Sequence, residues 1–587
     1  MKRRIWFWMS VGLVGLAAVF YLTYGDPTKA QAASLPGTAT LSGTVDSPAP
    51  FQAAQVFIRN KEKRMLYMVY TSEGKYRAVN LFPGEYKVSV RTWGLESDVQ
   101  ELTLSAGQSG NANLALKDTT NDPTRRGNLE YVSYDQAYPP GPGRVIAERT
   151  CNVCHGPNFL LSKRMNRAQW NSVIDMMRGK GDAAGGVMIL EKDMSDQDRD
   201  VLLDYLVANY GPDSKSRAVR VDKRLPVDEK VLSKAMYIEY YLQPDAPGQG
   251  VHDPKYAGTD AYGAGRRVGQ DPRFDNDGNV WLIDRGTPNR IVRLDPRTGA
   301  MKDYLTPRPT AGLHDIDFDR KSGIMWVPEN EGIPASDMKL LAFNPKTEKW
   351  EQEYHLDPQD LLDVPLKHAQ SLDIDSKGNV YVGMILGDGL SAWSRETKKV
   401  TTFPIPESIT GGHGSLPYGV IADQNDKIWI ALARRGKILK FDPQTSRFTE
   451  FVAPTNPSFI RRLNVDAKNN IWFPIFSSGE LVRLDQATGK MTSWKIPAQF
   501  SAPYDVQEYD GKIWIADAGQ ESTLIAFDPQ TEKFTFYPSP QPNADKPKIQ
   551  ITREGAIWYS PRSSRDYPGF GVLYPDMDKM TTFAAQY

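Results

Sequence analysis

The sequence predicts a multidomain, mainly β protein: a β-sandwich, then a small all-α domain, then a seven-bladed β-propeller. Three observations predict this order. Residues 36–117 alternate between apolar and polar side chains, residues 144–211 change to helical spacing, and residues 236–587 repeat about every 45 residues. The 71 basic and 71 acidic residues cancel, so net charge gives no reason to expect a nucleic-acid partner.

The first 32 residues are predicted to be a signal peptide or an N-terminal anchor. Lys2-Arg3-Arg4 precedes an uncharged apolar run over residues 5–24, and Ala30-Gln31-Ala32 forms a small-x-small cleavage site. An apolar run of this length could also stay in place and span a bilayer. In both cases the rest of the chain is exported and the expected compartment is the periplasm, with membrane contact only if the segment is uncleaved.

Residues 36–117 are predicted to form an antiparallel β domain. The runs Ala54–Ile58, Tyr86–Val90 and Val99–Leu104 have the alternation of half-buried strands, and Gly-containing pairs separate them. The order Leu41-Ser-Gly-Thr-Val45, Glu73-Gly-Lys-Tyr76 and Leu81-Phe-Pro-Gly-Glu-Tyr86 resembles the carboxypeptidase regulatory-like domain. That resemblance implies a sandwich used for binding or spacing, without chemistry of its own.

A polar, proline-rich linker over residues 118–143 leads to Cys151-Asn152-Val153-Cys154-His155, which contains the only two cysteines of the chain. Two thiols on one turn followed by a histidine are typical of covalent haem attachment. A redox dithiol and half of a zinc site are the alternatives, although a zinc site would need thiols that the chain lacks. We therefore expect one haem c per chain, bonded to Cys151 and Cys154, with His155 on the iron.

The helices predicted around this motif make residues 144–211 resemble a small class I cytochrome c domain. Ser195 is expected to cap the final helix, which ends in Asp204-Tyr205-Leu206. The resemblance implies a methionine as sixth iron ligand on the loop before that helix. Met188 fits best, and Met177 is the alternative. A methionine ligand would suit electron transfer.

After a linker over residues 212–235, seven repeats follow, each with a hairpin aromatic residue and most with an Asp-Pro or Asn-Pro turn. Seven repeats of this length predict a propeller, whose ring the strand Met236–Leu242 could close by pairing with the last blade. The hairpin aromatic residues are Trp281, Trp326, Tyr381, Trp429, Trp472, Trp514 and Trp558.

The Asp-Gly-Asn-Val-Trp hairpins and Asp-Pro-x-Thr-Gly turns resemble the virginiamycin B lyase (streptogramin lyase) propeller family. That resemblance implies Mg²⁺ and a histidine base, including a Glu-x-His pair in a late blade. No histidine follows His413 in this chain, so the pair is missing. We expect Mg²⁺ only under a lyase alternative.

Aligning the repeats places seven polar residues at the start of the innermost strands, around the central channel. Imidazole, phenol and cationic groups there could do acid–base work or bind an anion, whereas the alternative is a water-filled polar channel. The ring positions are Gln270, His314, Gln370, Tyr418, Arg461, Tyr504 and Lys548. The candidate site residues are His314, Glu329, Tyr418, Arg461, Tyr504 and Lys548.

Three functions of different classes follow from these features. The first is an oxidoreductase or electron-transfer component, in which a small-molecule substrate or partner dehydrogenase at the propeller reduces the haem, and a soluble redox carrier accepts the electrons. The second is a propeller lyase or hydrolase with an accessory cytochrome domain. The third is a non-enzymatic binding or sensing scaffold.

Overall fold

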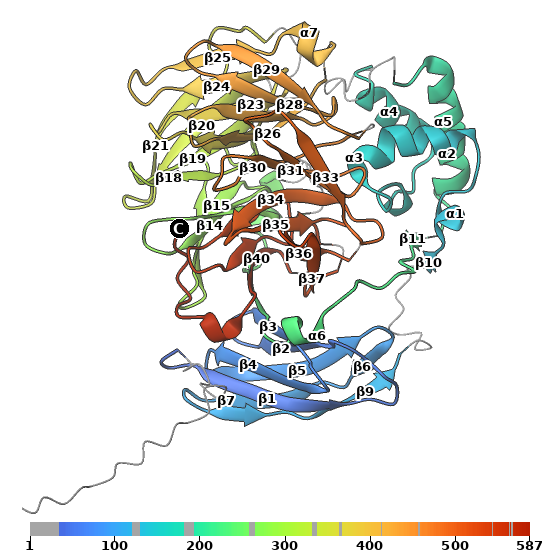
Figure 1. Cartoon of the computed structure of the whole chain (residues 1–587), viewed down its shortest axis with the longest axis vertical. Helices are drawn as coiled ribbons and strands as arrows, with labels where there is room; N and C mark the ends of the chain where they lie inside the picture. Colours follow the sequence, from blue (N-terminus) through green and yellow to red (C-terminus); the bar gives the residue numbers. More distant parts are fainter. Residues whose placement is uncertain are drawn as a thin grey trace, which may run out of the picture. The chain divides into compact units, whose positions relative to one another are not determined.

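The computed structural model describes residues 35–119, 130–180, 189, 193–215, 217–256, 265–331, 337–362, 367–412, 414–455, 458–519, 521–542, 544–562, 564 and 567–587 (Figure 1). The predicted signal segment, Met188 and His413 lie outside these residues. None of the helices in the described ranges is both long enough and apolar enough to cross a bilayer.

The N-terminal domain is a β-sandwich-like arrangement. Its core contains Leu41, Val56, Tyr67 and Val88, all fully buried. Val56 and Val88 lie in the runs Ala54–Ile58 and Tyr86–Val90, whose alternation the sequence predicted. The strands are β1 (Ala39–Asp46), β2 (Gln55–Asn60), β3 (Met65–Tyr70), β4 (Lys75–Leu81), β5 (Gly84–Thr92), β6 (Leu95–Ser97), β7 (Gln100–Leu104), β8 (Ser109–Asn111) and β9 (Leu114–Asp118).

The middle of the chain is helical, but it begins earlier and ends later than the sequence predicted. Two short parallel strands, β10 (Glu130–Val132) and β11 (Arg217–Val219), pair outside the predicted bounds, so the unit is not all-α. Val132 and Val219 are buried in the same apolar cluster as the helices, which explains why these supposed linker residues are ordered. The helices are α1 (Tyr134–Ala137), α2 (Pro142–Ala147), α3 (Val153–His155), α4 (Arg167–Met177) and α5 (Asp196–Tyr210).

The described C-terminal residues contain six separate sheets that form propeller blades. The first sheet contains β13 (Gly269–Phe274), β14 (Val280–Asp284), β15 (Arg290–Asp295) and β16 (Ala300–Leu305). The second contains β17 (Gly312–Leu313), β18 (Asp317–Asp319), β19 (Ile324–Glu331), β20 (Asp337–Asn344) and β21 (Lys349–His355). The third contains β22 (His368–Ile374), β23 (Val380–Leu386), β24 (Gly389–Trp393) and β25 (Val400–Pro404).

The other three sheets have the same four-strand order. They are β26 (Pro417–Ala422), β27 (Ile428–Leu432), β28 (Lys437–Asp442) and β29 (Arg447–Val452); β30 (Asn464–Val465), β31 (Ile471–Ile475), β32 (Glu480–Leu484) and β33 (Met491–Lys495); and β34 (Pro503–Tyr509), β35 (Lys512–Asp517), β36 (Thr523–Asp528) and β37 (Lys533–Pro538).

The predicted seventh blade is not a separate sheet. Its strands β38 (Gln550–Ile551), β39 (Ile557–Tyr559) and β40 (Gly569–Tyr574) belong to a 13-stranded sheet that continues into the N-terminal domain. The predicted closing strand, β12 (Met236–Tyr241), pairs with β40 on one edge and with β3 on the other. This double pairing merges the last strands with the sandwich, which no repeat in the sequence could reveal.

The repeated hairpin aromatic residues have a structural reason. The carboxylate of Asp275 accepts a hydrogen bond from the indole of Trp281 (2.8 Å) and another from the amide of Asn279 (2.9 Å). Asp423 does the same in another blade, where its Oδ2 accepts a hydrogen bond from Trp429 Nε1 at 2.9 Å. The aspartate thus closes the turn and satisfies the buried indole, so turn and aromatic residue recur together.

Asp517, at the end of β35, is a buried carboxyl group outside the ion pairs of the channel. Its Oδ1 accepts hydrogen bonds from the amides of Ala502 (2.7 Å) and Gly519 (3.2 Å) and from the Ser501 hydroxyl (3.2 Å). Burial outweighs these bonds and raises the pKa of Asp517 to about 6. The group therefore favours folding while it is protonated, and that contribution is lost as the pH rises from about 4 through about 6.

We expect Asp517→Asn to abolish the loss of stability at rising pH, because the amide keeps the accepting oxygen and cannot ionise. Between pH 4 and pH 7, the free energy of unfolding, measured by denaturant titration, should fall by about 3 kcal/mol less in this variant than in the parent protein. Asp510→Asn, on the exposed β34–β35 turn, is the matched control and should leave the pH profile unchanged. An unaltered profile in Asp517→Asn would show that Asp517 is ionised throughout.

Candidate functional site

The Cys151–His155 motif lies on a short irregular helix. Residues 142–147 form α2, residues 148–152 widen into a π-helical turn, and α3 carries Cys154 and His155. The Thr150 hydroxyl donates to the Ile146 carbonyl at 2.6 Å and is buried, which holds the widened turn. Such turns often occur at functional sites because they redirect side chains. Here Cys151, Cys154 and His155 all line one cavity.

This cavity has a volume of about 220 Å³ and is mostly apolar. Its helical walls are Thr150, Phe159, Leu160, Trp170, Val173, Ile174, Met177, Ile189, Met194, Leu202 and Leu206. The other wall comes from the propeller and consists of Ile385, Leu416, Tyr418, Arg434, Phe459 and Arg461. Haem c requires two thiols one turn apart, an adjacent imidazole and apolar walls. The residues at this cavity provide each of these and therefore fit the group.

His155 stacks on Phe159, with ring centroids 3.9 Å apart and an interplanar angle of 12°. Desolvation in the cavity lowers the pKa of His155 to about 4, and the nearby charges of Arg461 and Lys163 act in the same direction. The imidazole is therefore neutral at neutral pH, which is the form that can ligate iron.

The described methionines at the cavity are Met177 and Met194. Met177, the predicted alternative ligand, is half-buried at the end of α4, whereas Met194 is fully buried. Met188 lies outside the described residues, so its assignment as ligand stays a prediction.

Four of the six predicted propeller residues come together. The hydroxyl groups of Tyr418 and Tyr504 bond to each other, and Arg461 Nη1 donates to both at 3.0 Å. The ring of His314 lies edge-on to Tyr418, with centroids 6.2 Å apart. Gln370, another ring position, contacts His314 Nε2 at 2.5 Å. We call Gln270, His314, Tyr418, Arg461 and Tyr504 the propeller mouth.

The propeller mouth contacts the cysteine motif directly. Arg461 Nη2 donates to the Cys154 carbonyl at 2.6 Å. Arg434 Nη1 lies 3.9 Å from Cys154 Sγ, while its Nη2 pairs with Asp193 at 3.3 Å. An isolated β-bridge between Ile460 and Ile475 fixes the backbone next to Arg461. The motif and the predicted propeller ring therefore form one site.

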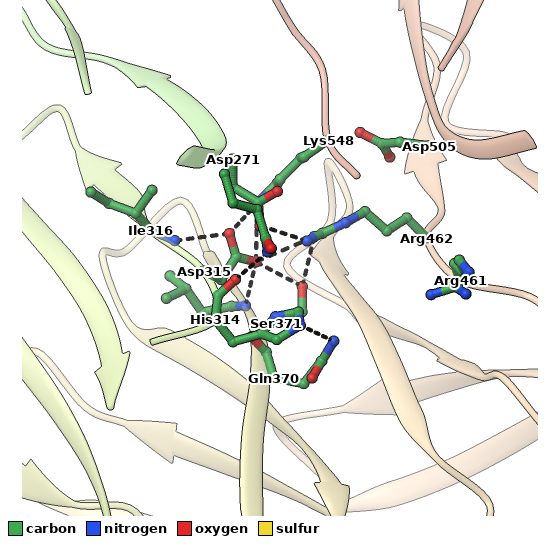
Figure 2. Close-up of polar contacts among 12 residues, drawn as sticks. Asp271, His314, Asp315, Ile316, Gln370, Ser371, Arg461, Arg462, Asp505 and Lys548 are labelled. Carbon is green, nitrogen blue, oxygen red and sulfur yellow. Dashed lines mark hydrogen bonds and ion pairs between the residues drawn. The ribbon is translucent and has the colours of Figure 1, made fainter. Parts of the chain in front are cut away.

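Glu329 and Lys548 do not join this group. Glu329 is buried against Arg308, whose Nε lies 2.6 Å from Glu329 Oε2. Lys548 Nζ contacts both oxygens of Asp315, at 3.0 and 3.2 Å, inside the channel. Figure 2 shows Asp315 with contacts to Lys548 and to Arg462, which also pairs with Asp271 at 2.8 Å. Both predicted residues are thus neutralised by ion pairs.

Sequence reasoning missed three arginines at the site, namely Arg285, Arg434 and Arg562. Arg285 and Arg562 each stand four residues beyond their hairpin tryptophans, Trp281 and Trp558. Within the residues that the structure describes, no group of three or more His, Cys, Asp or Glu side chains could hold a metal ion.

These elements define a mainly β chain in which a β-sandwich-like domain precedes a β-propeller. Residues 40–117 match the carboxypeptidase regulatory-like domain, as the sequence predicted. No curated protein sequence is matched by the chain.

Solved structures with similar folds include two lyases. Virginiamycin B lyase from Staphylococcus aureus is 18% identical with a TM-score of 0.44, over 52% of this chain and 94% of its own. A streptogramin B lyase is 17% identical with a TM-score of 0.46, over 58% of this chain and 97% of its own. The extracellular domain of a one component system from B. thetaiotaomicron is 15% identical with a TM-score of 0.40, over 53% of this chain and 38% of its own. The propeller assignment itself rests on the six sheets.

Proposed function

We propose that the chain is an exported haem c protein in which a donor at the propeller mouth passes electrons to haem held by Cys151, Cys154 and His155, and from there to a soluble acceptor. The donor is a small-molecule substrate or a partner enzyme. The observation that carries this proposal is Arg461, which hydrogen-bonds the Cys154 carbonyl and the Tyr418–Tyr504 pair at once. A donor at this mouth would lie beside the haem attachment site.

The residues have separate roles in this proposal. Bound haem would supply a one-electron redox couple. The neutral imidazole of His155 is available for the iron, while Trp170, Ile174 and Leu202 exclude water from the cavity. Arg461 positions the cysteine motif against the propeller, and it also donates to the buried Tyr418–Tyr504 pair, of which Tyr418 lines the cavity.

Two finer assignments belong to the same proposal. We assign β38, β39, β40 and β12 as the seventh blade, since their order β38-β39-β40-β12 is that of a four-stranded blade closed by an N-terminal strand. We assign the protein to the periplasm, because covalent haem attachment of this type occurs outside the bacterial cytoplasm.

The test is a reduced-minus-oxidised absorption spectrum of the purified, haem-loaded chain after addition of candidate donors. Reduction by a small molecule alone would support direct oxidation, and reduction only with a second protein would make the chain an electron-transfer component. A magnesium-dependent elimination product without any reduction would contradict the proposal and favour the lyase alternative.

We expect Arg461→Gln to slow reduction by the donor about tenfold. The shorter, neutral amide cannot replace all three hydrogen bonds of Arg461, and the loss of one charged hydrogen bond corresponds to roughly this factor. Reduction by dithionite, which does not need the mouth, should be unchanged. Arg447→Gln, on the exposed outer strand β29, is the matched control and should behave as the parent protein. Equal donor rates in both variants would show that electrons do not enter through the mouth.

A further inference from the structure

We propose that a second cavity, within the propeller, binds a small organic amine whose positive charge pairs with the carboxylates of Asp373 and Asp505. This second cavity has a volume of about 440 Å³. Its wall shares no residue with the propeller mouth or with the cavity of the cysteine motif. The inference therefore adds a separate binding site and does not rest on the proposed function.

Five polar residues of the second cavity occupy equivalent positions in five blades. Each comes three residues after one of the ring positions that the repeats predict, and the five are Arg273, Asp317, Asp373, Asn464 and Gln507. Side chains three apart on a regular strand point to opposite faces. A register shift inserts one extra residue between Gln270 and Arg273, and another between Ala369 and Leu372. Such bulges allow both sets of side chains to face the channel.

The buried cations of the cavity wall already have anionic partners. Arg273 Nε lies 3.0 Å from Asp317 Oδ1, and Arg462 and Lys548 pair with the channel carboxylates described above. The other two cations of the wall are exposed to solvent, which screens their charge, and they are Arg320 and Lys321. Among the described residues, the wall thus offers no unpaired buried cation to an anionic ligand.

Two carboxylates of the wall, in contrast, form no ion pair within the part of the chain that the structure describes. Asp373 accepts a hydrogen bond from the amide of Ala422 at 2.7 Å, and Asp505 accepts one from the amide of Ile549 at 2.9 Å. Asp505 is only 3% exposed, and its Oδ1 has no hydrogen-bond partner among the described residues. Figure 2 shows the Asp505 carboxylate outside the contacts that join Asp315, Arg462 and Lys548.

The surroundings make both carboxylates costly to ionise. Burial and the charge of Asp317 raise the pKa of Asp373 to about 7. Burial also raises the pKa of Asp505, because it outweighs the opposing charges of Arg462 and Lys548. A buried carboxylate is unfavourable unless a cation or a proton compensates its charge. A cationic ligand in the second cavity would supply that compensation.

An organic amine fits these residues better than a metal ion does. In the ranges that the structure describes, no group of three or more His, Cys, Asp or Glu side chains could hold a metal ion. An ammonium group carries three N–H donors around one charge, and carboxylates accept strong hydrogen bonds from it. The amides of Asn464 and Gln507 line the same wall and can bind polar atoms elsewhere in the ligand. Exposed Ser376 at the rim connects the cavity with solvent.

The experiment is isothermal titration calorimetry on the purified full chain with putrescine, a four-carbon diamine, and with the corresponding four-carbon diol. The diol keeps the carbon chain and the hydrogen-bond donors but has no charge. We expect the diamine to bind and the diol to bind about tenfold or more weakly, because only the diamine can form charged hydrogen bonds. Equal binding of the two, or no binding of the diamine, would overturn the inference. Binding of calcium chloride in place of the diamine would also overturn it, in favour of a metal site.

Asp373→Asn and Asp505→Asn should each weaken diamine binding about tenfold or more, because each removes one charged hydrogen bond. Both variants are expected to fold, since the amide keeps the oxygen that accepts from Ala422 or Ile549 and removes a buried charge. The matched control is Asp277→Asn, on the exposed β13–β14 turn, which should leave the affinity unchanged. If one cavity variant fails to fold, as judged by its thermal transition, the other decides the result. Equal affinity in the parent protein and in the folded cavity variants would refute the amine site.

Discussion

Cys151→Ala/Cys154→Ala is expected to abolish covalent haem attachment completely. The two thiols are the only ones in the chain, and both line the same cavity beside His155. No other group can form the thioether bonds, so the effect should be loss of the cofactor and not a change in affinity. Haem staining of the denatured protein after electrophoresis, with the haem-to-protein ratio from absorbance, gives the measurement.

The control separates loss of haem from loss of folding. His155→Ala keeps both thiols, so we expect covalent haem to remain detectable while the absorption spectrum changes with the lost iron ligand. The propeller sheets should persist in all variants, which far-UV circular dichroism checks. If the cysteine variant transferred electrons from the same donor at the parental rate, the redox proposal would be wrong.

The repeats in the sequence were sufficient to predict the propeller because several blades close their hairpins in the same way. An aspartate that caps the turn and binds the indole, as Asp275 does for Trp281, leaves a pattern at fixed spacing. The pairing of β12 with β40 was predicted and is confirmed, whereas the pairing of β12 with β3 leaves no such pattern. Strand pairing between distant segments depends on tertiary contacts, so the 13-stranded sheet could not be predicted from local alternation.

The candidate site could be predicted from the sequence only in part, because repeat alignment locates residues within the ring but does not show their contacts. Repeat alignment shows which residues share a ring, so Tyr418, Arg461 and Tyr504 were identified together. It does not show which charges pair across the channel, and Lys548 is neutralised by Asp315 from another blade. Nor does it show that residues from a separate helical segment contact the ring, because the bond from Arg461 to Cys154 joins residues 307 positions apart.

Asp315→Ala is expected to cause the largest loss of stability among the channel substitutions. Asp315 is fully buried and contacts Lys548 at 3.0 Å and Arg462 at 3.2 Å. Burial alone would raise its pKa, yet these two cations hold the pKa of Asp315 well below its ordinary range. Removing the carboxylate takes from two buried cations the partner that they share, which should cost about 3–5 kcal/mol in the free energy of unfolding.

The matched control is Asp295→Ala, which removes the partner of the exposed Arg297 at 2.7 Å and should change the free energy of unfolding by about 1 kcal/mol or less.

A double substitution tests whether the loss of stability arises from charge. Asp315→Asn/Lys548→Met leaves the Arg462–Asp271 pair balanced, so the double variant should be more stable than the sum of its single variants predicts. Additive losses in denaturant titrations would mean that the channel residues stabilise the propeller by packing and not through their ion pairs. Coupled losses would mean that the channel charges neutralise one another and stabilise the propeller through their ion pairs.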